Sequence, residues 1–401
     1  MKKLILKFYY LLLESCDFIK PPCFIKNPFK KYDLVIFDDI FPNPISGFRY
    51  AEFDAYLKYF ESSKIITSSG SYKVLNQTDG QFYEDVYSYR RANPNTSAKL
   101  NILRRFNNIN GNLFYCVFYN NIIGKIDTLN RLKIPFIFTL YPGGGFNLKN
   151  EEIIKNLRRV CQSPYFKGII ATQKITVEFL EKNQICSRDQ INYLFGGIIP
   201  QHSINVQRQL FYGHNKKTLD ICFCAAKYME GGRDKGYDIF VETAYLLSQK
   251  YSEVHFHVIG GFNVNDIELN SLATKFTFYG YKKYEELQSI FLRMDFILSP
   301  NRPDTLHPGF FDGFPLGTVV EAALCGVIPL LTDELKQNDA FNNDEVFICQ
   351  PNANSFFQQL EKLLIADLKV ISSKVQRRFR EIYSNDTQLV KRINFLKKHI
   401  N

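Results

Sequence analysis

The stretch FFDGFPLGTVVEAALCG, residues 310–326, combines residue types that can bind a polar ligand. Asp312 and two glycines precede a helical pattern that starts near Thr318 and carries a second acid, Glu321. The first turn of a helix offers unpaired N–H groups and a positive dipole end, and glycine permits close backbone approach. Two carboxylates would repel a bare phosphate, so we expect them to bind hydroxyl groups, as of a ribose or hexose. An ordinary capped turn with solvated acids is the alternative.

A second glycine-rich turn, AAKYMEGGRDKG, is flanked by two lysines. Lys227 ends an apolar strand pattern, and Lys235 stands directly before a helical pattern over 236–251. Cations beside a helix start can stabilise a phosphate or a leaving group that gains negative charge. A single surface lysine is usually only solvated, but two lysines around a turn at a strand's end favour a function. Arg233 lies in the same loop as an alternate.

The first half of the chain has two further loops of this kind. DDIFPNPISGFRYAEF, residues 38–53, follows the first strong strand and places Gly47 and Arg49 near a helix start. LYPGGGF, residues 140–146, follows a later strand, and its three consecutive glycines indicate close approach of the backbone to a ligand.

These loops need a scaffold, and the pattern along the chain predicts parallel α/β architecture. Apolar strand-like runs alternate with longer helical patterns. We expect strands at 32–40, 64–69, 113–121, 134–141, 167–173 and 191–197, then at 219–227, 254–262, 275–281, 294–300, 326–332 and 345–351. The two series predict two doubly wound domains, and ligands of such domains bind beyond the carboxyl ends of the strands. The expected parts are an amphipathic extension (1–30), an N-terminal domain (31–205), a C-terminal domain (215–385) and a final helix (386–401).

The composition of the chain limits the number of domains, the class of partner and the compartment that we expect. A chain of 401 residues that is 45% hydrophobic and 22% charged is expected to fold as two globular domains. The formal net charge of +10 favours an anionic partner, but Lys and Arg never run beyond doublets, which argues against nucleic acid. Nine cysteines without a CxxC pair indicate a reducing compartment, hence the cytoplasm.

The N-terminal stretch MKKLILKFYYLLLESCDFIK is too short to span a bilayer. Read as a helix, it has one apolar stripe, which includes Phe8 and Leu12, and three lysines near its start. Two interpretations stay open: a helix packed on its own domain, or an interfacial helix on the inner face of a membrane.

The segment DGFPLGTVVEAALCGVIPLLTD resembles the donor site of the retaining GT-B glycosyltransferases of family 4. This resemblance implies that Glu321 binds the ribose of a nucleotide sugar and that Asp312 contacts the donor sugar. It also implies that Lys227 and Lys235 bind the diphosphate. Asp312 departs from the pattern, because it is Asp rather than Glu and lies one position further from Glu321 than is usual.

The resemblance extends over 219–335 and implies further contacts. FTFYGYKKYEEL matches the segment that holds the nucleotide base. The additional donor-site residues implied are Gly280, Tyr281, Gly313, Phe314, Thr318, Val320 and Arg233. Those implied for the acceptor or diphosphate loops are Gly47, Arg49, Gly143, Gly144 and Gly145. Many family members have a sugar-contacting histidine in the first domain, and this sequence shows no counterpart to it.

The resemblance implies a transferase that moves a hexose-type sugar from a UDP- or GDP-linked donor to a glycan or lipid-linked saccharide, with retention, in polysaccharide or glycoconjugate synthesis. No DxD stands at a strand end, so we expect neither a metal nor another cofactor, with the lysine pair in the metal's place. A dinucleotide oxidoreductase and a P-loop enzyme are disfavoured, since neither GxGxxG nor GK[S/T] follows a first strand. A GT-B sugar-nucleotide epimerase and a non-catalytic nucleotide-binding protein stay open as alternatives.

Overall fold

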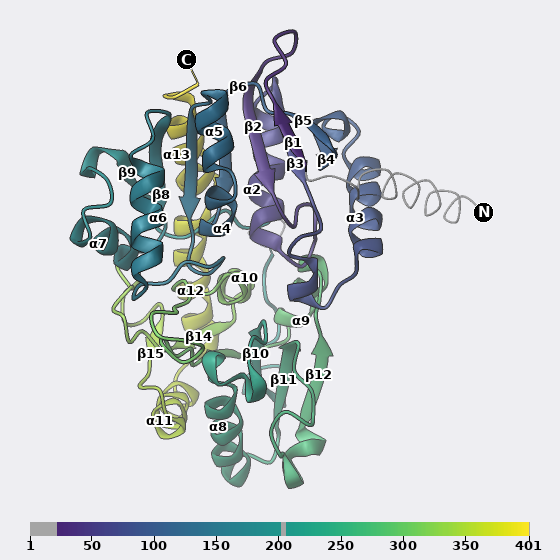
Figure 1. Cartoon of the computed structure of the whole chain (residues 1–401). Coiled ribbons are helices and arrows are strands. Elements are labelled where there is room, and N and C mark those ends of the chain that lie inside the picture. The colour runs from purple at the N-terminus through teal and green to yellow at the C-terminus, as the bar shows by residue number, and fades with distance from the viewer. Residues whose placement is uncertain (1–21, 202–205, 401) are drawn as a thin grey trace.

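The computed structural model describes residues 22–201 and 206–400 and contains two parallel α/β domains (Figure 1). The predicted fold class is therefore confirmed. In Figure 1 the N-terminal domain lies above the C-terminal domain, and the final helix α13 lies behind the upper sheet.

Seven parallel strands form the N-terminal sheet in the order β4-β3-β2-β6-β7-β8-β9. Their apolar runs are typical of strands buried on both faces. In β2, for example, Leu34 and Ile36 enter one core while Val35 and Phe37 enter the other. The strands are β2 (Tyr32–Asp38), β3 (Ser63–Thr67), β4 (Leu100–Ile102), β6 (Gly111–Val117), β7 (Phe136–Leu140), β8 (Phe166–Ala171) and β9 (Ile191–Tyr193).

Helices cover both faces of this sheet. One core takes its helical side chains from α2 (Gly47–Tyr59), α3 (Asp79–Ala92) and α13 (Asn385–Lys397). The other takes them from α4 (Tyr119–Ile123), α5 (Ile126–Leu132), α6 (Glu151–Cys161) and α7 (Lys174–Lys182). Among the described residues, short 3-10 turns include η1 (Tyr72–Leu75), η2 (Ser97–Lys99) and η3 (Arg188–Gln190).

A small two-stranded sheet lies at the start of the described chain. β1 (Cys23–Ile25) pairs in parallel with β5 (Phe106–Asn108). The last residues of the segment that we expected as an extension, 1–30, therefore belong to the N-terminal domain. The remainder of that segment, 1–21, lies outside the described residues.

Six parallel strands form the C-terminal sheet in the order β12-β11-β10-β13-β14-β15. Cys222 and Cys224 of β10 are buried in the core on one face, and Ile221 and Phe223 are buried on the other. The strands are β10 (Leu219–Ala225), β11 (Val254–Gly260), β12 (Phe276–Gly280), β13 (Phe296–Ser299), β14 (Ile328–Leu331) and β15 (Phe347–Ile348). The helices and turns are η5 (Glu230–Lys235), α8 (Tyr237–Lys250), η6 (Asn270–Lys275), α9 (Tyr284–Phe291), α10 (Gly317–Leu324), α11 (Ala353–Leu364) and α12 (Leu368–Tyr383).

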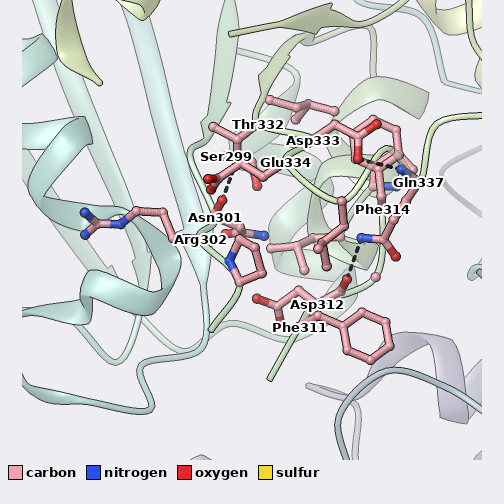
Figure 2. A pocket seen from close by; sticks show the side chains of 16 residues that line it. Ser299, Asn301, Arg302, Phe311, Asp312, Phe314, Thr332, Asp333, Glu334 and Gln337 are labelled. Carbon is pink, nitrogen blue, oxygen red and sulfur yellow. Dashed lines mark hydrogen bonds between the residues drawn. The ribbon is translucent and has the colours of Figure 1, made fainter. Parts of the chain in front are cut away.

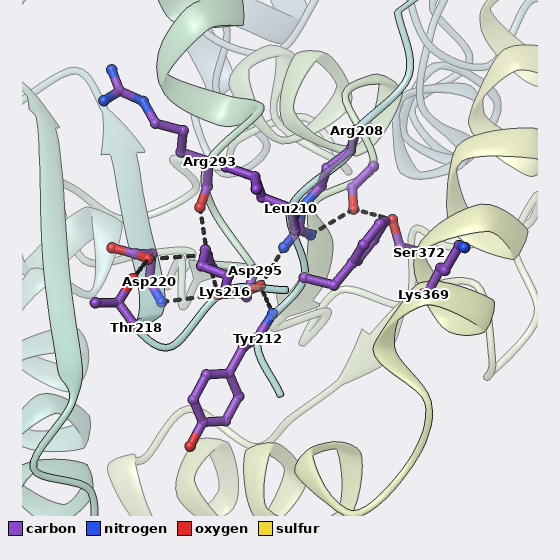
Figure 3. A network of polar contacts seen from close by, with 12 residues as sticks. Arg208, Leu210, Tyr212, Lys216, Thr218, Asp220, Arg293, Asp295, Lys369 and Ser372 are labelled. Carbon is purple, nitrogen blue, oxygen red and sulfur yellow. Dashed lines mark hydrogen bonds and ion pairs between the residues drawn. The ribbon is translucent and has the colours of Figure 1, made fainter. Parts of the chain in front are cut away.

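Two segments connect the domains. The first, whose described part is 206–218, has neither helix nor strand and is anchored at the amino end of the C-terminal sheet. Figure 3 shows the anchor: Arg208 pairs with the buried Asp295, and Lys216 Nζ lies 2.5 Å from Asp295 Oδ2 and 3.0 Å from Asp220 Oδ2. The second connection follows α12, after which α13 packs against α2 and returns the chain to the N-terminal domain.

Some strands are shorter than expected. The predicted strand 113–121 ends at Val117, because Phe118 has a φ of 71° and α4 begins at Tyr119. The strand expected at 345–351 is reduced to Phe347–Ile348. Within the described residues, no helix has both the length and the apolar character to cross a membrane.

Candidate functional site: the cleft between the domains

A cleft of about 640 Å³ lies where the carboxyl ends of the two sheets face each other. This is the place at which doubly wound domains bind ligands. Most of the predicted site residues line it: Gly47, Arg49, Gly143, Gly144, Gly145, Lys235, Tyr281, Asp312, Gly313, Thr318, Val320 and Glu321. The fold thus brings together loops that are separated by up to several hundred residues in the chain.

Glu321 is the most unusual side chain of the cleft. It lies in α10, is only 6% exposed, and its Oε2 is buried without a hydrogen-bond partner. Burial raises the pKa of its carboxyl from 4.5 to about 8. Across the cleft, a Cβ on Gly47 would lie 3.1 Å from Glu321 Oε1, so a side chain there would crowd the carboxylate. Glu321 therefore has unused acceptor capacity for a ligand that donates hydrogen bonds.

Lys235 is held between two carboxylates. It is 2% exposed, and its Nζ lies 2.6 Å from both oxygens of Asp312 and 3.7 Å from Asp234 Oδ2. Burial alone would lower the pKa of this ammonium, but the attraction of Asp312 and of Tyr228 outweighs burial and raises it. The lysine is thus charged, and it adjoins the start of α8 at the floor of the cleft.

The loop that carries Asp312 is fixed from both domains. Gln337 Nε2 donates to the Asp312 carbonyl at 3.1 Å, as Figure 2 shows, and Gln173 Nε2 of the N-terminal domain donates to the Phe314 carbonyl at 3.3 Å. The pocket of Figure 2 behind this loop holds about 30 Å³, which is room for about one water rather than a sugar. The position of the Asp312 carboxylate is therefore set by its surroundings.

Helix α10 presents its amino end to the cleft. No side chain caps it, because its N-cap residue is Leu316, so its first N–H groups are suited to an anion. The Thr318 hydroxyl donates to the Cys224 carbonyl at 2.7 Å and so ties this helix to the end of β10. Val320 adds an apolar wall.

The three consecutive glycines of the loop after β7, Gly143 to Gly145, differ in their surroundings. All have positive φ angles, between 56° and 85°. A Cβ on Gly144 or Gly145 would lie 2.5 Å from Phe118 or 2.1 Å from Asn120, so the protein's own packing requires these two glycines. A Cβ on Gly143 would meet nothing within 4 Å, so only this glycine leaves open space.

Arg49 lines the cleft, but its charge is already compensated. Its Nη1 lies 2.6 Å from Asp39 Oδ1 and 3.1 Å from Asp38 Oδ2, and its guanidinium stacks 4.8 Å from the Phe118 ring centre. Burial raises the pKa of Asp38 to about 6 against the opposing effect of Arg49. Arg49 is thus part of an acid-rich cluster rather than an unpaired cation for a diphosphate.

Four predicted site residues do not line the cleft. Lys227 pairs with Asp266, and Arg233 is exposed, with its carbonyl accepting from Arg302. Gly280 ends β12 at a φ of 67°, and the Phe314 ring is buried in the core beside α10. Lys227 precedes the turn η5 and Lys235 is its last residue, and of the two only Lys235 lines the cleft.

The cleft also has residues that sequence reasoning missed. His307 lies in the loop after β13, and its Nδ1 is 2.9 Å from Asn147 Nδ2 of the N-terminal domain. Further polar and aromatic lining comes from Asn120, Asn121, Tyr141, Thr172, Gln173, Tyr228 and Phe310. The only available signal was their position, since each lies at the end of a predicted strand or in the loop that follows one. In the part of the chain that the structure describes, no three His, Cys, Asp or Glu side chains gather as metal ligands would.

Comparisons with known proteins agree with this architecture. Residues 220–366 match the family model described as glycosyl transferases group 1. A search of curated proteins found no match. HepE of Anabaena, solved in complex with UDP and glucose, has 12% identity and a TM-score of 0.63 over 92% of this chain and 100% of its own.

Two other solved structures have similar values. A glycosyltransferase from Rickettsia africae has 14% identity and a TM-score of 0.61, over 92% of this chain and 99% of its own. Sucrose-phosphate synthase from Thermosynechococcus elongatus has 10% identity and a TM-score of 0.59, over 92% of this chain and 98% of its own. At identities this low, the structural similarity establishes only a shared fold, which is GT-B. Within this GT-B fold, the similarity to the group 1 glycosyl transferases covers residues 220–366, in the C-terminal domain.

Proposed function

We propose that this protein transfers a hexose-type sugar, with retention, from a nucleotide-sugar donor to a glycan or lipid-linked saccharide. The observation that carries the proposal is Glu321, a buried carboxylate that faces the cleft with an oxygen that lacks a hydrogen-bond partner. A ribose offers two adjacent hydroxyls, and a single carboxylate can accept a hydrogen bond from each of them. UDP is the first nucleotide to test, because HepE of the same fold is described with UDP and glucose.

The remaining cleft residues suit the rest of such a donor. With its ribose on Glu321, a nucleotide sugar would extend its diphosphate toward the amino end of α10 and toward Lys235. Its sugar would then lie beside Asp312 and Gly313, with Tyr281 near the base. The acceptor would enter over Gly143 and beside Arg49, from the N-terminal domain.

The chemistry follows from these positions. As the bond between the anomeric carbon and the donor phosphate breaks, the phosphate oxygen keeps the electron pair, and Lys235 stabilises its charge. The acceptor hydroxyl forms the new bond on the same face of the sugar, and its proton passes to the departing phosphate oxygen. A closed cleft limits the competing attack by water.

Lys227 has a smaller part in this proposal than Lys235. Both ammonium groups pair with an aspartate, Lys227 with Asp266 and Lys235 with Asp312, but only Lys235 lines the cleft. We therefore assign Lys227 a supporting role.

Nucleotide binding tests the donor site. Thermal unfolding is followed with UDP, GDP, ADP and their sugars for the wild type, for Glu321→Ala and for Glu242→Ala, whose side chain is exposed on α8. At a ligand concentration of 100 times Kd, the expected stabilisation of the wild type is about 2.7 kcal/mol. Glu321→Ala should weaken binding at least about tenfold, as expected for the loss of two hydrogen bonds to the ribose, and Glu242→Ala should not. Equal affinity in all three proteins would refute the ribose assignment.

The products then separate the transferase from its two alternatives. A transferase releases nucleoside diphosphate in proportion to glycosylated acceptor. An epimerase would convert the donor without any acceptor, and a binding protein would leave donor and acceptor unchanged. Either of these last outcomes would overturn the proposal.

A further inference from the structure

The end of the N-terminal domain that lies away from the cleft carries an unusual surface. We call it the basic ribbon, and it comprises β1, β5, the loop 26–31 and residues 104–105. Phe29 is 96% exposed and Phe106 is 60% exposed, and Ile25 of β1 is exposed as well. Large apolar side chains with this much exposure are typical of interaction sites.

The register of the ribbon explains why these side chains face outward. Phe24 of β1 and Asn107 of β5 are register partners, and both are buried beneath the ribbon. Because side chains alternate along a strand, their neighbours Ile25 and Phe106 point to the other side. The ribbon is thus anchored by one face and presents the other to solvent.

The same surface has one sign of charge. Lys26, Lys30, Lys31, Arg104 and Arg105 are all exposed on it. The sequence has no Asp or Glu between residues 17 and 33 or between residues 85 and 127.

Another exposed apolar side chain provides a contrast. Ile365, in the C-terminal domain, is 90% exposed but lies two residues from Asp367. Phe106 of the ribbon, in contrast, has no acid within twenty residues on either side.

The ribbon and the cleft lie at opposite ends of the N-terminal sheet. β1 leads into the amino end of β2 and β5 into the amino end of β6, whereas the cleft is formed at the carboxyl ends (Figure 1).

We propose that the basic ribbon docks the protein on an anionic membrane surface. Phe29 and Phe106 enter the headgroup region, while the lysines and arginines around them bind anionic headgroups. Docking at this end leaves the cleft open to its substrates. The proposal is independent of the sugar that the cleft transfers.

Vesicle sedimentation of the full chain tests the proposal. The protein should bind vesicles of phosphatidylcholine with phosphatidylglycerol and not vesicles of phosphatidylcholine alone, and added salt should weaken binding. Lys30→Glu with Lys31→Glu should lower the affinity at least about tenfold, since each basic residue near an anionic surface contributes about 1 kcal/mol. Phe29→Ser should lower the affinity about threefold or more, because it removes a large apolar group from the interface.

Matched controls are Ile365→Ser and Lys155→Glu, both at exposed positions outside the ribbon, which should bind as the wild type does. Equal binding to neutral and anionic vesicles, or unchanged binding of the ribbon variants, would overturn the proposal. Unchanged binding of those variants would assign the membrane contact to residues 1–21. Capture of an acidic protein without vesicle binding would also overturn it.

A fluorescent reporter gives a second readout. The chain has no tryptophan, so Phe29→Trp places a single one at the tip of the loop. Its emission should shift to shorter wavelength with anionic vesicles, and Ile365→Trp should show no such shift. Absence of a shift at position 29 while the protein sediments with vesicles would show that this loop does not enter the membrane.

Discussion

Two buried glutamates, one in each domain, have opposite surroundings. Glu52 of α2 is fully buried and accepts hydrogen bonds from the hydroxyls of Tyr56 at 3.1 Å, Tyr141 at 2.8 Å and Tyr115. Glu321 of α10 is almost as buried, but its Oε2 has no partner. The amount of burial does not distinguish the two; the number of donors does.

This difference separates structure from binding. A buried acceptor without a donor destabilises the folded state by about 1–3 kcal/mol. A protein can tolerate such an unsatisfied acceptor where a bound ligand supplies the missing hydrogen-bond donors. Glu52 binds the side chains of its own core, and Glu321 is available to bind something else.

The largest effect is expected at the satisfied glutamate. Glu52→Gln removes the charge that three tyrosines and the nearby Arg392 surround, so we expect the free energy of unfolding to fall by about 3 kcal/mol or more. Urea unfolding measures it, with the exposed Glu61→Gln as control. A loss below about 1 kcal/mol would show that the tyrosine cluster does not need the carboxylate.

The next effect concerns activity. Lys235→Ala should lower kcat/KM roughly 100-fold, because a preorganised positive charge is lost at the leaving group. Circular dichroism should show a retained fold. A change of less than about threefold would remove Lys235 from the site.

A pH effect is expected from Glu321. The pKa of Glu321 is raised to about 8 in the folded protein from 4.5, so the folded state binds a proton more tightly than the unfolded state. The free energy of unfolding should therefore fall as pH rises from about 4.5 to about 8. Glu321→Gln should remove this fall and be more stable than the wild type above about pH 8, by about 1–3 kcal/mol. Melting curves at several pH values measure it. A parallel pH dependence in both proteins would mean that Glu321 is ionised throughout.

The smallest effect is expected at the lysine that does not line the cleft. Lys227→Ala removes an ammonium that pairs with Asp266 and is absent from the cleft lining, so kcat/KM should fall by less than about fivefold. The same assay as for Lys235→Ala measures it. Equal losses in the two variants would show that Lys227 leaves Asp266 when the donor binds.

The scaffold was predictable because its signals are local. Runs such as YDLVIFD bury both faces of a strand, and parallel strands place the loops that follow them at one edge. That argument was sufficient to bring Lys235, Asp312 and Glu321 into one cleft. The ends of short strands were less predictable, as at Phe118, where the chain turns after β6 without a glycine.

The pairing of charges could not be predicted, because it depends on segments that are distant in the chain. The sequence near Lys227 does not indicate that this lysine forms an ion pair with Asp266. The ion pairs of Arg49 with Asp38 and Asp39 depend on the orientation of α2 after β2. His307 lines the cleft and is hydrogen-bonded there to Asn147 of the other domain. Such contacts are set by how two independently patterned domains meet.

The return of α13 means that the N-terminal domain is not one continuous piece of chain. Ile393 and Leu396 fill its core, and the fully buried Arg392 donates to the Gly196 carbonyl at 2.8 Å. A fragment that stops before the C-terminal domain would therefore leave a hole in its own interior. A separate peptide of residues 385–401 should complement that fragment, and swapping C-terminal domains between proteins of this fold will succeed only if this last helix stays with the first half.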